Sequence, residues 1–278
     1  MKKRILLIAA IVLSTAGLVR AQETTLEETK LEKNKLGVTL DVTWVSKYLW
    51  RGIDRLDDKA AFQPSVNFDL YDTGFSFKLW MSYAGSSGSS SSLPGGGRVN
   101  ATEYRYIAAY DCTLFKSERY ATDVTANYIY YDFIDEPDKA QDAQEVGVGF
   151  SWPNICPAGF VPSYYVGKIW PSKSNSTLTG EYGGWVHIFG VGYDLKVPDF
   201  LPDRPEQVIN LSAAVVYNDG FAGANVDHDW SHATFGVSTG IAVGKLTFTP
   251  AVYYQASFDD SVNREDELYT GMSVSCSF

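Results

Sequence analysis

Basic residues, cysteine and long apolar runs are all scarce in this sequence. One apolar run, over residues 5–19, follows Lys2, Lys3 and Arg4 and leads to small residues ending at Ala21, the pattern of a cleaved secretory signal peptide. No Cys stands at that cut site, so a lipid anchor is not indicated. No second stretch of about 18 apolar residues follows, and we therefore expect no membrane-spanning helix in the mature chain.

The scarcity of basic residues gives the mature chain a strong negative charge. The leader, residues 1–21, holds four of the 23 Lys and Arg and none of the 33 Asp and Glu, which leaves a net charge of −14. Such an acidic chain is a poor nucleic-acid binder, so no nucleic-acid partner is expected. Residues 22–36 are polar and free of aromatics and are expected to form a periplasmic tail, with residues 37–278 as one large domain.

Alternation of apolar and polar residues is abundant. Phe62, Val66 and Phe68, for example, alternate with polar residues, and strand side chains point to opposite faces in turn. The pattern recurs in about twelve segments of roughly ten residues, the length with which a tilted strand crosses a bilayer. The segments are 37–51, 62–70, 75–84, 103–111 and 123–131, with further runs that start near residues 145, 160, 184, 207, 232, 246 and 267.

This pattern predicts an all-β fold, a transmembrane antiparallel up-and-down β-barrel. A closed barrel is the strand architecture that leaves no unpaired backbone in hydrocarbon. Nearly every strand has large apolar residues on one face and small polar residues, glycine and mixed charges on the other, which argues against the alternative of a secreted β-sandwich. The expected location is therefore the outer membrane of a Gram-negative bacterium, in contact with lipid and lipopolysaccharide.

The connections between the segments alternate in length, as outer-membrane barrels require. We expect the long ones to be external and the short ones to be periplasmic, with 196–205 as a long periplasmic exception. Several external loops are acidic. The favoured interpretation is that these charges are simply solvated; the alternative is that they bind divalent cations that also bridge lipopolysaccharide. The long connections are 52–59, 85–100, 132–142, 171–182, 218–230 and 258–266, and the short ones are 72–73, 113–119, 153–158 and 243–245.

The stretch WVSKYLWRGIDR, residues 44–55, is interpreted as the end of the first strand. Period two then places Trp44, Tyr48 and Trp50 toward lipid or its interface, where amphipathic rings are favoured. The same parity places Lys47 and Arg51 in a watery lumen.

Inward charges and aromatics define a predicted pore lining. The basic group at mid-depth favours small anions; in the alternative, these bases pair with Glu103, Glu145 and neighbouring acids in a network that fills the lumen. Inward glycines such as Gly147 and Gly236 would widen the lumen elsewhere. The predicted pore-lining residues are Lys47, Arg51, Lys78, Trp80, Arg105, Glu145 and Lys168.

The scarce cysteines and histidines offer few special sites. Of Cys112, Cys156 and Cys276, the first two are the favoured disulfide pair, with three free thiols as the alternative. His228 and His232 have no third ligand at a recognised spacing, so no metal site is expected.

His187 alternates with Trp185 and Phe189 and would face the bilayer. A lipid hydrolase would need a serine partner there, which is not evident, and no G-x-S-x-G stretch occurs. We expect no enzyme activity, no catalytic residue and no cofactor, with lipid hydrolysis as a remote alternative.

Residues 38–84 resemble the N-terminal signature of the TorF-type porin family. The signature has a V-S-x-Y-x-x-R-G stretch followed by a strand that contains Gln and Pro. The resemblance implies an outer-membrane location and pore activity, and it supplies no substrate. The matching residues are Val45, Ser46, Tyr48, Arg51, Gly52, Gln63 and Pro64.

The chain ends in MSVSCSF, with Met272, Val274, Cys276 and Phe278 on one face of the last strand. This ending resembles the C-terminal signal by which outer-membrane barrels are recognised for insertion, which implies the barrel-assembly machinery as a partner. The sequence thus predicts a small pore for passive or weakly selective passage of small solutes, including anions. The alternative is a non-transporting structural, adhesive or assembly-linked barrel, and the oligomeric state stays open.

Overall fold

A computed structural model describes residues 35–85, 102–134, 142–156, 159–172, 183–198, 206–221 and 228–278. The predicted signal peptide and nearly all of the predicted tail lie outside the described residues.

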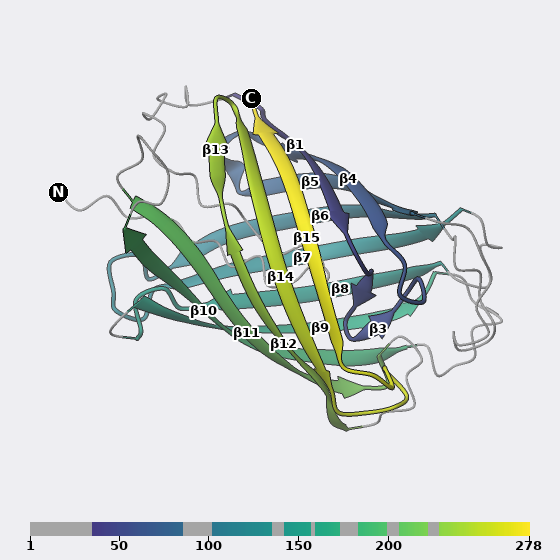
Figure 1. The fold of residues 1–278 in the computed structure, drawn as a ribbon. Coiled ribbons are helices and arrows are strands. Elements are labelled where there is room, and N and C mark those ends of the chain that lie inside the picture. Colours follow the sequence, from purple (N-terminus) through teal and green to yellow (C-terminus); the bar gives the residue numbers. More distant parts are fainter. Residues whose placement is uncertain are drawn as a thin grey trace.

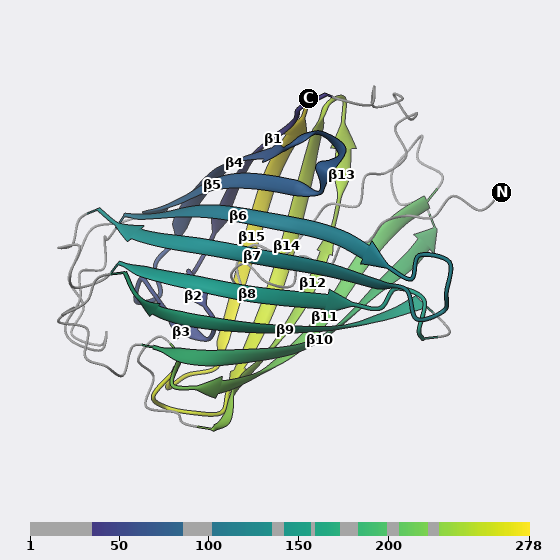
Figure 2. The same cartoon turned by 180° about the vertical axis from the view of Figure 1, so that it is seen from behind.

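The described residues form one closed antiparallel β-barrel of twelve wall strands (Figure 1, and from behind in Figure 2). Each strand pairs with its neighbours in the chain, and β1 pairs with β15 while β12 pairs with β14, so the sheet has no free edge. The short β13 continues β12 past Gly240. The wall strands are β1 (Gly37–Val45), β4 (Ala61–Asp69), β5 (Phe75–Ala84), β6 (Glu103–Leu114), β7 (Thr122–Phe133), β8 (Ala143–Ser151), β9 (Phe160–Pro171), β10 (Gly184–Pro198), β11 (Glu206–Asp219), β12 (Asp229–Thr239) with β13 (Ile241–Val243), β14 (Leu246–Ser257) and β15 (Glu267–Ser277).

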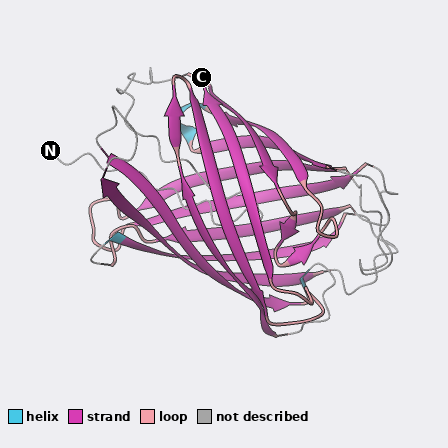
Figure 3. Cartoon of the chain, in the orientation of Figure 1, coloured by secondary structure: helices cyan, strands magenta, loops and turns pink. Residues whose placement is uncertain are grey.

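The outer face of the barrel is apolar, as the alternation predicts. At the seam that closes the barrel, Val42 pairs with Val274 and Trp44 with Met272, and all four side chains point outward. Large exposed apolar side chains recur around the whole wall, from Leu40 on β1 to Leu268 on β15. Strands dominate the described structure (Figure 3), and no helix among the described residues is long and apolar enough to cross a membrane.

The two ends of the barrel differ in their connections. At one end, which we call the turn end, strands are joined by short turns such as the 3-10 turn η1 (Tyr71–Thr73), and the C-terminus lies there. At the other, the loop end, lie the described connections 46–60 and 258–266. In outer-membrane barrels the end with short turns faces the periplasm.

The first connection differs from the prediction. Strand β1 ends at Val45 rather than continuing to residue 51, and residues 46–60 fold into the barrel as a plug that contains a small hairpin, β2 (Leu49–Trp50) and β3 (Ile53–Asp54). Tyr48 and Trp50 are 2% exposed and pack against the inner wall, so the prediction that they face lipid is wrong, while Trp44 does lie on the outer face. Residues 52–59, predicted to be an external loop, belong to the plug.

The favoured disulfide does not form. Cys112, Cys156 and Cys276 are all free thiols in the structure. Cys112 lies on β6 and Cys156 follows β8, and β7 is paired between these two strands and keeps the thiols apart.

Candidate functional site: the plugged lumen

The tip of the plug is a two-residue turn at Arg51 and Gly52, between β2 and β3. Both residues have positive φ, +50° and +89°, the combination that two-residue hairpins with the correct twist require. A Cβ on Gly52 would lie 2.6 Å from His232 Nδ1 and 2.7 Å from a methyl carbon of Val262. Glycine therefore allows both the turn and its close approach to the wall.

Arg51 crosses the lumen from this turn and reaches β8. Its Nη2 donates to Glu145 Oε1 at 2.6 Å, and both side chains are at most 3% exposed. The same carboxylate accepts hydrogen bonds from the Tyr131 hydroxyl at 2.7 Å and the Tyr165 hydroxyl at 2.5 Å. The guanidinium carbon lies 4.5 Å from the ring centroid of Phe221, within cation–π range.

A second ion pair lies beside the first on the wall. Arg105 Nε donates to Glu103 Oε1 at 2.6 Å, and both residues lie on β6. The plug joins this pair through Tyr48, whose hydroxyl donates to Glu103 Oε2 at 2.9 Å and accepts from Arg105 Nη2. The Arg105 guanidinium also stacks over Trp80 at 4.4 Å, so each buried charge has a counter-charge and an aromatic face.

Apolar contacts fix the rest of the plug to opposite sides of the wall. Trp50 packs edge-on against Tyr131 of β7 and tilted against Phe221. Leu49 is fully buried with Tyr253 of β14 and Tyr269 of β15. The plug therefore contacts strands around the whole lumen and closes its loop-end half.

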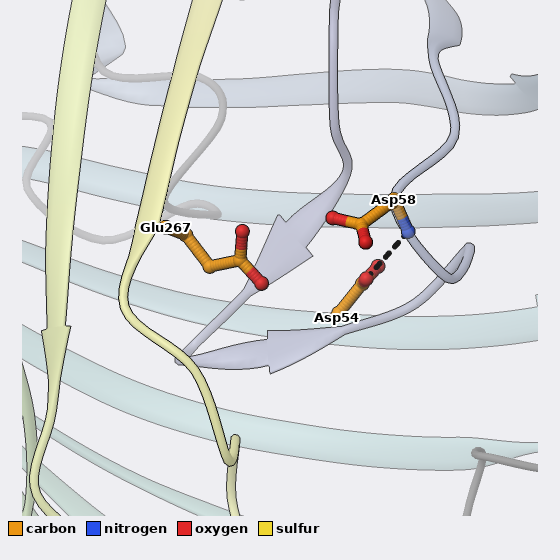
Figure 4. Close-up of side chains that lie close together, drawn as sticks. All are labelled: Asp54, Asp58 and Glu267. Atoms are coloured by element: carbon orange, nitrogen blue, oxygen red, sulfur yellow. Dashed lines mark hydrogen bonds between the residues drawn. The ribbon is translucent and has the colours of Figure 1, made fainter.

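Three carboxylates, those of Asp54, Asp58 and Glu267, gather at the rim of the plug, with their oxygens within 4.8 Å of one another (Figure 4). The Lys47 ammonium forms ion pairs with both Asp58 and Glu267. Partial burial lowers the pKa of Lys47, but the two carboxylates outweigh this effect and raise the pKa above its ordinary value. Asp54 accepts the backbone N–H groups of Leu56 and Asp58. The cluster is thus satisfied by the chain itself, and we assign no metal to it.

The turn-end half of the inner wall is lined differently. Its inward aspartates are partly or fully exposed, and they accept hydrogen bonds from neutral groups on the same or the next strand, such as Thr125 to Asp111 at 2.5 Å and Asn210 to Asp194 at 2.7 Å. Lys78 and Lys196 lie on the same half. We call this set of inward carboxylates the aspartate wall: Asp41, Asp69, Asp111, Asp123 and Asp194.

Solved structures with a similar barrel include two porins and an outer membrane channel. The KdgM porin matches with a TM-score of 0.51 and 10% identity, over 86% of this chain and 99% of the porin. The NanC porin matches with a TM-score of 0.50 and 10% identity, over 85% and 98%. An outer membrane channel from Pseudomonas putida F1 matches with a TM-score of 0.51 and 9% identity, over 91% and 100%.

The fold is that of small outer-membrane porins. At these identities the likeness establishes the architecture, a closed barrel of twelve strands, and nothing finer. No family model matches the chain. No curated protein matches it in sequence.

The structure places most predicted pore-lining residues inside. Lys78 and Trp80 point inward from β5, and Arg105 and Glu145 from β6 and β8. Lys168 is the exception: it lies on the outer face of β9, 5.2 Å from the ring of Trp185, because Gly167 and Ile169 take the inward positions. Its prediction as a pore-lining residue is therefore wrong.

Three of the predicted basic lining residues are neutralised by acids. Lys47, Arg51 and Arg105 each pair with a carboxylate, which is the alternative that the sequence left open. Gly147 and Gly236 do not widen the lumen as predicted, because the Tyr165 hydroxyl fills the space over Gly147 and the Tyr253 ring lies over Gly236.

The remaining predicted residues are those of the family signature and of the C-terminal insertion signal. Val45 ends β1 pointing inward, Ser46 Oγ accepts the backbone N–H of Thr270, and Gln63 is fully buried on the inner wall while its neighbour Pro64 points outward. Met272, Val274, Cys276 and Phe278 share the outer face of the last strand and its end.

The histidines have separate environments. His187 faces outward, and its Nδ1 lies 2.8 Å from the Tyr164 hydroxyl. His228 lies beside Asp219, with its side chain 68% exposed. His232 is fully buried behind Gly52, with Nδ1 2.9 Å from Ser231 Oγ.

Several residues of the plugged site escape sequence reasoning. Glu267, Gln255 and Phe221 contact the plug from strands or connections far away in the chain, and nothing local marks them. The Arg51–Gly52 turn carries only a partial signal: Gly52 permits positive φ, but Arg-Gly is not among the residue pairs typical of two-residue hairpins.

Proposed function

We propose that this protein is a gated channel for small solutes in the outer membrane. The support is a closed barrel with the fold of small porins, an apolar outer face and an inner wall lined by polar and charged residues. Outer-membrane lipid and lipopolysaccharide would contact the outer face, and the end of β15 would engage the barrel-assembly machinery.

One observation supports the proposal of a gate. Residues 46–60 close the loop-end half of the lumen, and this segment is joined covalently to the wall at its two ends only. Between those ends it is held by side-chain contacts, chiefly Arg51 with Glu145 and Tyr48 with Glu103. Eight-stranded barrels are filled by wall side chains and barrels of 16 to 18 strands hold water channels. A barrel of intermediate size that is closed by a removable segment suits regulated passage.

The resemblance to TorF-type porins fits this proposal. Its signature residues Tyr48, Arg51 and Gly52 form the plug, and Val45 and Ser46 mark the point where the chain leaves the wall. We infer that this signature encodes the plug rather than a strand that faces lipid.

A non-transporting structural barrel is the second candidate. It is favoured by the complete burial of both ion pairs and the aromatic side chains around them in the loop-end half. Lipid hydrolysis lacks comparable support, since the hydrogen bond that the structure gives His187 on the outer face is to a tyrosine rather than to a serine.

Single-channel recording in planar lipid bilayers separates the two candidates. The folded protein is first identified by its altered gel mobility before and after boiling. We expect rare openings with discrete ohmic steps in the wild type, and frequent openings when the Arg51–Glu145 pair is broken. Silent traces from folded wild type and from folded Glu145→Gln alike would favour the structural barrel.

A further inference from the structure

The group that the plug inserts into the wall is a guanidinium, and the wall surrounds it with a defined set of groups. We call the set of Glu145, Tyr131, Tyr165 and Phe221 the socket. The carboxylate supplies the counter-charge, and the aromatic rings of Phe221 and Tyr165 lie 4.5 Å and 5.4 Å from the guanidinium carbon.

The socket belongs to the wall rather than to the plug. Its members come from β7, β8, β9 and the residues just after β11. The Tyr131 and Tyr165 hydroxyls both donate to the Glu145 carboxylate, so two of its hydrogen bonds come from the wall itself. A fixed carboxylate among aromatic faces is an arrangement that recognises organic cations, and planar guanidinium groups above all.

Arg51 fills the socket incompletely. Its Nε and Nη1 are buried without a hydrogen-bond partner among the described residues, so one of its three nitrogens is paired. A tethered guanidinium reaches the socket at an angle set by the hairpin. A soluble cation has no such constraint and can orient its donors freely, so it can compete with Arg51.

The path from the turn end favours the same class of solute. Among the described residues of that half, the five carboxylates of the aspartate wall outnumber the inward lysines Lys78 and Lys196, and each carboxylate accepts a hydrogen bond from a hydroxyl or amide group. Acids that line a narrow passage with low-dielectric walls raise the local concentration of cations.

We propose that the socket is a binding site for small organic cations that carry a guanidinium or primary ammonium group, and that such a cation displaces Arg51 and releases the plug. The binding step stands on the wall geometry; the release step rests on the proposed channel function. The channel would then pass organic cations, in contrast to the anions that unpaired basic groups would favour.

The binding step is tested with Arg51→Ala, which empties the socket, and with methylguanidinium as the probe. Folding of the variant is checked by heat-dependent gel mobility. Because Trp50 packs against the socket, tryptophan fluorescence reports occupancy. We expect a saturable change with methylguanidinium and none with N-methylurea, a neutral molecule of similar shape.

A matched double variant identifies the counter-charge. Arg51→Ala with Glu145→Gln should bind methylguanidinium roughly tenfold more weakly or worse, as expected for the loss of a charge-assisted hydrogen bond. An equal response to N-methylurea, or equal affinity in the double variant, would overturn the socket. If Arg51→Ala fails to fold, wild-type protein serves: methylguanidinium should speed trypsin cleavage of the plug at Arg55, and unchanged cleavage would also overturn the socket.

The release step is measured in bilayers containing the wild type. Guanidinium chloride should raise the open probability above that in sodium chloride of equal ionic strength, and reversal potentials should show cation preference. Saturable binding with silent bilayers in every variant would refute the proposed channel and leave the socket intact. Openings that ignore guanidinium, or that prefer anions, would refute the release step.

Discussion

The two halves of the lumen are built on the same strands, but their charged side chains differ in burial and in hydrogen-bond partners. Strand β6 shows both: Glu103 and Arg105 near its loop end are buried and paired, whereas Asp111 near its turn end is partly exposed and bonded to a threonine hydroxyl. The plug makes the difference, because it fills the loop-end half. A charged side chain that is buried away from water needs an opposite charge to offset its lost hydration. A carboxylate that water still reaches is sufficiently stabilised by a hydrogen bond from a hydroxyl.

This contrast determines where single substitutions matter. An ion that loses its buried partner costs much more than a partly hydrated one, because its desolvation is no longer offset. Changes in the loop-end half should therefore move the plug, and equivalent changes in the turn-end half should alter selectivity alone.

The largest effect is expected from Glu145→Gln. It leaves Arg51 buried without a counter-charge, which should destabilise the plugged state by about 3–5 kcal/mol. Limited trypsin digestion at Arg55 should become fast, and bilayer openings should become frequent. Asp111→Asn is the control from the turn-end half and should leave digestion at the wild-type rate; equal acceleration in both variants would contradict the contrast between the halves.

A smaller effect is expected from Gly52→Ala. Positive φ costs a non-glycine residue about 1–2 kcal/mol, and the added methyl would also press on His232 and Val262. Gly244→Ala is the matched control, because Gly244 also has positive φ but nothing within 4 Å of its Cβ position. We expect faster plug digestion for Gly52→Ala alone; if the Gly244 variant behaves the same way, packing against the wall is not what holds the turn.

Charge reversal of two lysines sharpens the contrast between the inner and outer faces. Measured in a Glu145→Gln background that opens the lumen, Lys78→Glu should shift the reversal potential in a salt gradient toward cation preference. Lys168→Glu should leave the reversal potential unchanged, because Lys168 lies on the outer face beside Trp185. A shift of equal size with Lys168→Glu would mean that β9 faces the other way.

The smallest effect concerns pH at the rim of the plug. Burial raises the pKa of Asp54, and the charges of Asp58 and Glu267 add to this, outweighing two backbone hydrogen bonds that lower it. The plugged state therefore binds this proton more tightly than a released plug does. Lowering the pH from neutral through the raised pKa toward the ordinary value of about 4 should stabilise the plugged state.

Open probability at neutral and mildly acidic pH measures this effect. The wild type should open less often in acid, and Asp54→Asn should show a flatter dependence. An open probability that rises on acidification in the wild type, with the variant unchanged, would assign the dominant titration to another group.

The strand pattern was predictable wherever one face is apolar and the other polar. Strands β4 to β7 have this contrast in full; their predicted starts agree within one residue and their ends within three, and inward residues such as Lys78 and Arg105 agree with the sequence. In the loop-end half the contrast fails, because the inner face is dry too. On β9 the inward residues Tyr165 and Ile169 are as apolar as the outward ones, so the parity of Lys168 was misjudged.

By itself, the sequence determined the barrel, its strand directions and the aromatic outer face, because alternation is a local property that each strand carries independently. Only the tertiary structure decided that residues 46–60 leave the wall and enter the lumen. That choice depends on Glu145, Glu103 and Glu267, which lie 94, 55 and 220 residues from their plug partners Arg51, Tyr48 and Lys47. Burial of a charge is favourable only when its counter-charge is present, and closure of the barrel is what brings the two together.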